Sequence, residues 1–94
     1  MKDWLTVQTS DDYAKEVRQW LPDLTAKQVT YMGMQLHNFD ADCYLDSKYG
    51  HGLASESLTR LYALSDLFGH TIHYRYDEWI REQIRQIQGK YHKD

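Results

Sequence analysis

The chain has 94 residues, of which 41% are apolar and 14% aromatic, and its formal net charge is −3. This length and apolar content predict one folded domain over residues 1–94, while the weak charge argues against both a basic nucleic-acid binder and a polyanionic mimic of nucleic acid. No apolar run approaches the length of a membrane span, and a single cysteine without a signal-peptide pattern predicts a cytoplasmic protein.

A first helix is predicted over residues 10–21. Thr9 and Asp12 have the spacing of a capping box, and acidic side chains are favoured in the first turn of a helix. Pro22 ends the helix, because the residue before a proline avoids helical geometry. The expected buried face consists of Tyr13, Val17, Trp20 and Leu24.

A second helix is predicted over residues 25–46, and it has the clearest start because Thr25 and Gln28 form a capping-box pattern. Its apolar residues recur at steps of 3, 4, 3 and 4, the spacing of a stripe that packs against another helix or, in a homodimer, against a second copy. Gly33 lies beside this stripe and would permit close approach of a neighbouring helix. The stripe consists of Val29, Met32, Leu36, Phe39 and Cys43.

A third helix is predicted over residues 55–68, followed by a segment with two interpretations. Residues 71–76 alternate and are rich in β-forming side chains, so they could pair as a strand with residues 4–7. Their apolar residues also fit one helix over residues 71–88, which we favour because two strands alone are marginally stable. The predicted fold is therefore all-α, a small bundle of three or four helices, with an α+β arrangement as the alternative. The polar residues from Gly89 onward are expected to fray.

Residues 37–52 hold the highest density of side chains that can coordinate a metal or donate or accept a hydrogen bond. Their spacing matches no catalytic or metal motif. Cys43 would need His37 or His51 as a base to act as a nucleophile, but the helical stripe is expected to bury it as an inert thiol. We therefore expect no enzymatic activity, no catalytic residue and no cofactor.

Two alternative functions are binding of a metal and binding of nucleic acid. His70, His73 and Asp77 would lie roughly on one helical face, although the paired ligand spacing of a structural zinc site is missing. Arg81 and Arg85 fall on one side of the last helix near aromatic residues, a combination that can grip a nucleic-acid strand. The overall charge argues against nucleic acid as the partner, and we expect no metal site.

Binding of a protein partner is the function that the composition favours. The chain has eight tyrosines and three tryptophans, and Trp, Tyr and Arg are enriched at binding hot spots. We expect a small inhibitor, immunity or antitoxin-like protein, or an adaptor, that occludes a partner surface, with aspartates facing a basic region of that surface. The predicted partner-binding residues are His70, Tyr74, Arg75, Trp79, Tyr44, Tyr49, Asp40, Asp42 and Asp46.

Overall fold

The computed structural model describes residues 7–50, 52–68 and 73–91, with the side chains of all of these except residues 65–68, 73 and 74. Within these ranges the chain forms four helices and no strand, which confirms the all-α prediction. None of the described helices is long and apolar enough to cross a membrane. The helices are α1 (Ser10–Trp20), α2 (Ala26–Tyr49), α3 (Ala54–Phe68) and α4 (His73–Tyr91).

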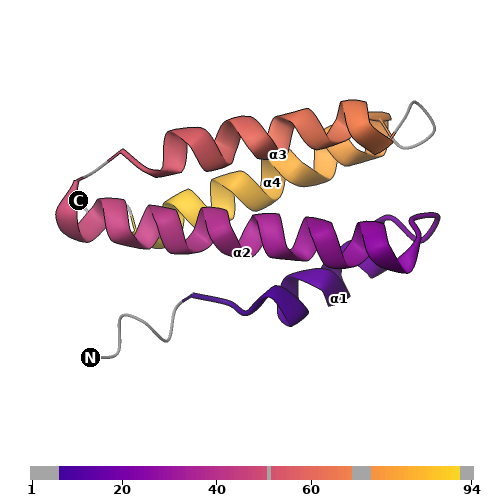
Figure 1. Cartoon of the computed structure of the whole chain (residues 1–94), viewed down its shortest axis with the longest axis horizontal. Coiled ribbons are helices and arrows are strands. Elements are labelled where there is room, and N and C mark those ends of the chain that lie inside the picture. Colours follow the sequence, from indigo (N-terminus) through magenta and orange to yellow (C-terminus); the bar gives the residue numbers. More distant parts are fainter. Residues whose placement is uncertain (1–6, 51, 69–72, 92–94) are drawn as a thin grey trace.

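The long helix α2 is the centre of the bundle (Figure 1). It packs against α1, α3 and α4, and α3 also packs against α4. Figure 1 shows α1 and α3 on opposite sides of α2. In the described residues, the backbones of α1 and α4 come close at few points, so these two helices are joined mainly through side chains.

The α+β alternative is wrong for residues 73–76, which belong to α4. Residues 4–6, 71 and 72, which complete the two proposed strands, lie outside the described residues. The helix prevails because its period buries one apolar face against α2 and α3, whereas a strand would have had a single short partner. The buried face of α4 consists of Tyr76, Trp79, Ile80, Ile84 and Ile87.

The helix starts follow the predicted capping rules. Thr9 accepts a hydrogen bond from the backbone N–H of Asp12 at 3.1 Å, which confirms it as the N-cap of α1. Thr25 and Gln28 form the reciprocal capping box of α2, with bonds of 3.0 and 3.2 Å. Both caps satisfy amide groups that the first turn of a helix leaves without partners.

Two expectations about the helix surfaces and ends are wrong. Trp20 is 55% exposed, and Leu21 takes the place assigned to it in the core at 1% exposure, because a step of four from Val17 follows the buried face better than a step of three. The end of α4 is not frayed, since the helix continues to Tyr91. Lys90 and Tyr91 are held there by a buried carboxylate described below.

The stripe predicted on α2 forms the central part of the core. All five of its residues are buried within the chain, so the stripe is not available as a homodimer seam. Gly33 beside it lies against α1, where an added Cβ would come within 2.6 Å of the Ser10 carbonyl oxygen and 3.0 Å of the Ala14 nitrogen. The predicted close approach at Gly33 is therefore confirmed.

Substituting this glycine should weaken the packing of α1 on α2. We expect Gly33→Ala to lower the free energy of unfolding by about 2 kcal/mol, because the clash is with backbone atoms that cannot rotate away. Gly89→Ala is the matched control, since nothing lies within 4 Å of its Cβ position, and it should raise the free energy by about 0.5 kcal/mol. Urea unfolding followed by circular dichroism measures both. Equal stability of Gly33→Ala and the wild type would contradict the packing described.

Candidate functional site

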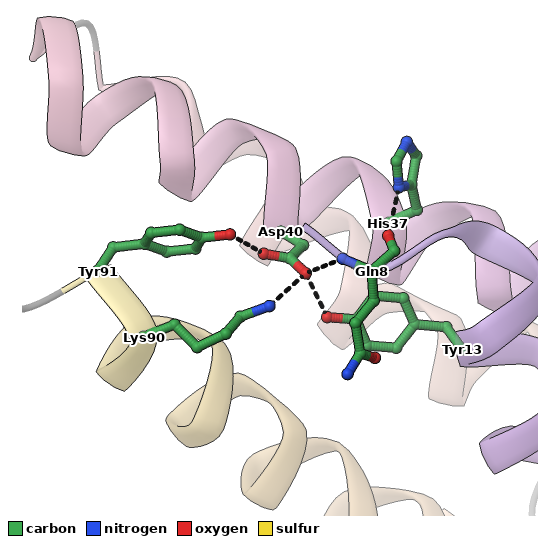
Figure 2. Close-up of polar contacts among 6 residues, drawn as sticks. All are labelled: Gln8, Tyr13, His37, Asp40, Lys90 and Tyr91. Carbon is green, nitrogen blue, oxygen red and sulfur yellow. Dashed lines mark hydrogen bonds and ion pairs between the residues drawn. The ribbon is translucent and has the colours of Figure 1, made fainter. Parts of the chain in front are cut away.

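The Asp40 carboxylate is fully buried where α1, α2 and α4 meet (Figure 2). It accepts hydrogen bonds from the Tyr13 hydroxyl at 2.6 Å and the Tyr91 hydroxyl at 2.5 Å. It also accepts from the Gln8 backbone N–H at 3.1 Å and pairs with the Lys90 ammonium at 2.7 Å. One side chain thus joins the segment before α1, α1 itself and the end of α4 to the middle of α2.

This burial contradicts the expectation that Asp40 faces a basic region of a partner surface. Asp40 follows Leu36 by four residues and precedes Cys43 by three, so it lies at the edge of the buried stripe. A buried carboxylate is stable there because four donors replace its water shell. Burial, followed by the hydrogen bond to Asp40 and its charge, raises the pKa of Tyr13, so its hydroxyl remains a donor.

The other two predicted aspartates make contacts within the chain. Asp42 accepts a hydrogen bond from the buried Ser57 hydroxyl on α3. Asp46 accepts from the backbone N–H groups of Leu53 and Ala54, at 2.7 and 2.8 Å, and so caps the start of α3. Both carboxylates hold α3 against α2, a role that local spacing did not indicate.

The predicted tyrosines near the end of α2 differ in exposure. Tyr44 is half-buried, with its ring edge-on to that of Tyr91 at 5.9 Å between centroids and Lys48 above its face. Tyr49 is 64% exposed. Of this predicted patch, only Tyr49 presents most of its surface to solvent.

Cys43 is buried in the core, as the helical stripe predicted. Burial and nearby aspartates raise the pKa of its thiol to about 12, so it is protonated at neutral pH and a poor nucleophile. The imidazole Nδ1 of His37 lies 2.8 Å from the Gln8 carbonyl oxygen (Figure 2). His51 lies outside the described residues, and among those described no three His, Cys or acidic side chains converge as a metal site.

The four residues predicted for partner binding near the start of α4 have different outcomes. His70 and the side chain of Tyr74 lie outside what the structure describes. Arg75 is exposed, and its guanidinium donates to the Trp20 carbonyl at the end of α1 at 2.9 Å. Trp79 is only 2% exposed, so the prediction that it projects as a surface anchor is wrong. The predicted environments of both tryptophans are therefore reversed in the structure: Trp20 was expected in the core from its helical spacing, and Trp79 was expected in the interface from its residue type.

Trp20 and Trp79 both line a hollow of about 620 Å³ between α1 and α4, which we call the α1/α4 groove. Trp20, 55% exposed, stands on its α1 wall, and the edge of Trp79 lines it from α4. An exposed tryptophan beside a groove is a feature of protein-binding surfaces. The groove residues used below are Glu16 and Trp20 from α1, and Glu78, Trp79, Glu82 and Gln83 from α4.

A polar bridge crosses the α1/α4 groove. With its amide oriented to suit both neighbours, the buried Gln83 donates to the Glu16 carboxylate at 3.3 Å and accepts from the Trp79 indole N–H at 3.2 Å. On the α4 wall, Arg85 pairs with Glu82 at 2.8 Å. These bonds hold the side chains of the groove in place. The groove lining consists of aromatic surface, carboxylates and other polar groups, and its described residues include no hydroxyl or thiol nucleophile.

Comparison with protein-family models, with curated proteins and with solved structures finds no match for this chain. Two observations therefore define the candidate site: the partial exposure of Trp20, and the open space between α1 and α4. Of the residues predicted for partner binding, Arg75 and Trp79 lie beside this space. Trp20 and the glutamates were missed, because only the pairing of α1 with α4 brings them together.

Removing the charge of Asp40 should loosen both walls of the groove. Asp40→Asn loses the ion pair with Lys90 and places an amide N–H₂ among groups that are all donors, so we expect the free energy of unfolding to fall by about 3 kcal/mol. Asp23→Asn, at an exposed loop position, is the control and should change it by less than about 0.5 kcal/mol. Urea unfolding provides both values, and an unchanged stability of Asp40→Asn would rule out this role for the carboxylate.

Proposed function

We propose that the chain is a non-enzymatic protein-binding module, an inhibitor or adaptor that covers a partner surface, and that the α1/α4 groove is its binding face. The exposure of Trp20 is the observation that carries this proposal. Indole groups bury a large apolar area on binding and are the side chains most enriched at hot spots. Among the described residues, Trp20 is the tryptophan that projects into solvent, and it does so at the rim of a groove, where a partner could cover it.

The position of Trp20 supports an anchoring role. Its backbone carbonyl accepts the hydrogen bond from Arg75, so the end of α1 is tied to α4 where the indole projects. The next residue, Leu21, is 1% exposed, and its packing in the core holds the backbone at the end of α1. An anchor held on a rigid backbone loses little conformational freedom on binding, which favours affinity.

The raised pKa of Cys43 and its burial support a non-enzymatic role, because the only thiol of the chain is protonated inside the core. A single buried cysteine also fits a reducing compartment, which supports our proposal of a cytoplasmic location. Three aspartates predicted at the interface instead bind groups within the chain: Asp40, Asp42 and Asp46. We therefore propose the groove, and not the end of α2, as the interface.

Affinity capture with matched variants tests the proposal. The tagged chain, Trp20→Ala and Tyr31→Ala are each used as bait, with nuclease, in lysate of the cells that naturally produce the protein. Tyr31 is 44% exposed on α2, away from the groove, and serves as the control. We expect the wild type and Tyr31→Ala to retain the same stoichiometric protein, and Trp20→Ala to lose at least about 30-fold in affinity for it, corresponding to a hot-spot residue. Equal retention by all three baits would contradict the assignment of the groove.

A further inference from the structure

The walls of the α1/α4 groove carry carboxylates from both helices. Glu16 projects from α1, and Glu78 and Glu82 lie one turn apart on α4. Arg85 pairs with Glu82 on the solvent side, where the two side chains are 74% and 47% exposed. With Arg75 on the Trp20 carbonyl included, three acidic groups and two basic groups leave a formal charge of −1 around an exposed indole. The charge and the exposed indole together limit which kinds of molecule can bind in the groove.

The groove has the length of a short helix. Beyond Gln83 it continues into a second hollow that shares Glu16, Gln83 and Gln86 and ends at Gln8 and Lys90. From Glu78 to Lys90, α4 rises by roughly 18 Å at 1.5 Å per residue. A helix of about three turns therefore matches the length of this surface, and it would lie over the Gln83–Glu16 bridge that joins the two walls.

The charge of the groove excludes other occupants. A nucleic-acid strand would bring phosphates against Glu16, Glu78 and Glu82. A wholly apolar helix would remove water from these carboxylates and add no cationic partner, at a cost in desolvation. A second copy of this chain, placed groove to groove about a two-fold axis, would oppose the same acidic residues to each other.

We propose that the occupant of the α1/α4 groove is a cationic amphipathic helix of another protein. Its apolar residues pack on Trp20, and its lysines or arginines pair with Glu16 on one wall and with Glu78 and Glu82 on the other. A cation above the indole adds a cation–π attraction. Glu78 and Glu82 line the larger hollow with Trp20, Glu16 lines both hollows, and Lys90, paired with Asp40, lines the smaller one. The proposal rests on the proposed function and names the chemical class of its partner.

A synthetic peptide of roughly four helical turns, with leucines on one face and lysines on its flanks, is the probe. Binding is measured by fluorescence anisotropy of the labelled peptide at low and high salt. The same peptide with glutamate in place of lysine is the charge control. We expect the lysine peptide to bind, its affinity to fall at high salt because the contacts are electrostatic, and the glutamate peptide not to bind. Failure of the lysine peptide to bind, or equal binding of both peptides, would overturn the proposal.

Paired variants locate the contact. Glu78→Gln/Glu82→Gln removes two groove carboxylates, whereas Asp23→Asn/Glu56→Gln removes two exposed carboxylates elsewhere and leaves the same net charge. We expect the groove variant to bind the lysine peptide about 10-fold more weakly and the control to bind like the wild type. Equal weakening of both would show attraction to overall charge only, and would overturn the assignment to the groove.

The two proposals fail separately. If Trp20→Ala loses the captured protein but the lysine peptide does not bind, the groove is an interface and its occupant is not a cationic helix. If the lysine peptide binds and is sensitive to Glu78→Gln/Glu82→Gln while capture is unaffected by Trp20→Ala, the groove accepts such a helix and the proposed hot spot at Trp20 is wrong.

Discussion

The buried carboxylate of Asp40 fixes how the helices of this bundle are placed. It is bound by donors from the segment before α1, from α1 and from the end of α4, all converging on the middle of α2 (Figure 2). Because the backbones of α1 and α4 come close at few points in the described residues, their relative position depends on their attachment to α2 and on a few side-chain bonds between them. Asp40 therefore sets one end of the α1/α4 groove, and the Arg75–Trp20 hydrogen bond sets the other.

The groove is also shaped by the bonds that cross it. Gln83 joins Trp79 to Glu16 across the base, so the two walls are coupled without being closed. This leaves one large indole, that of Trp20, on the rim. A helix that enters the groove would meet a surface already arranged for it, and preorganisation of this kind reduces the entropy lost on binding.

Local rules predicted what depends on local geometry. The caps at Thr9 and Thr25, the buried stripe of α2 and the close approach at Gly33 follow from spacing within one helix. The position of Asp40 was not predicted, because its partners Tyr13 and Lys90 lie 27 and 50 residues away. The groove was missed for the same reason, since its two walls are far apart in the sequence. Trp20 was misplaced because steps of three and of four from Val17 both fit a helical stripe, and only the packed structure shows that Leu21 is the buried residue.

The central claim is that the α1/α4 groove, rather than another face of the bundle, receives the partner. Mapping of ¹⁵N–¹H chemical shifts in the wild-type chain during titration with the lysine peptide tests it most directly. We expect the largest changes at the indole N–H groups of Trp20 and Trp79, and at the backbone amides of Glu16 and Glu78. Changes concentrated around Tyr31 and Met34 on α2, with the two indole signals unmoved, would contradict the account.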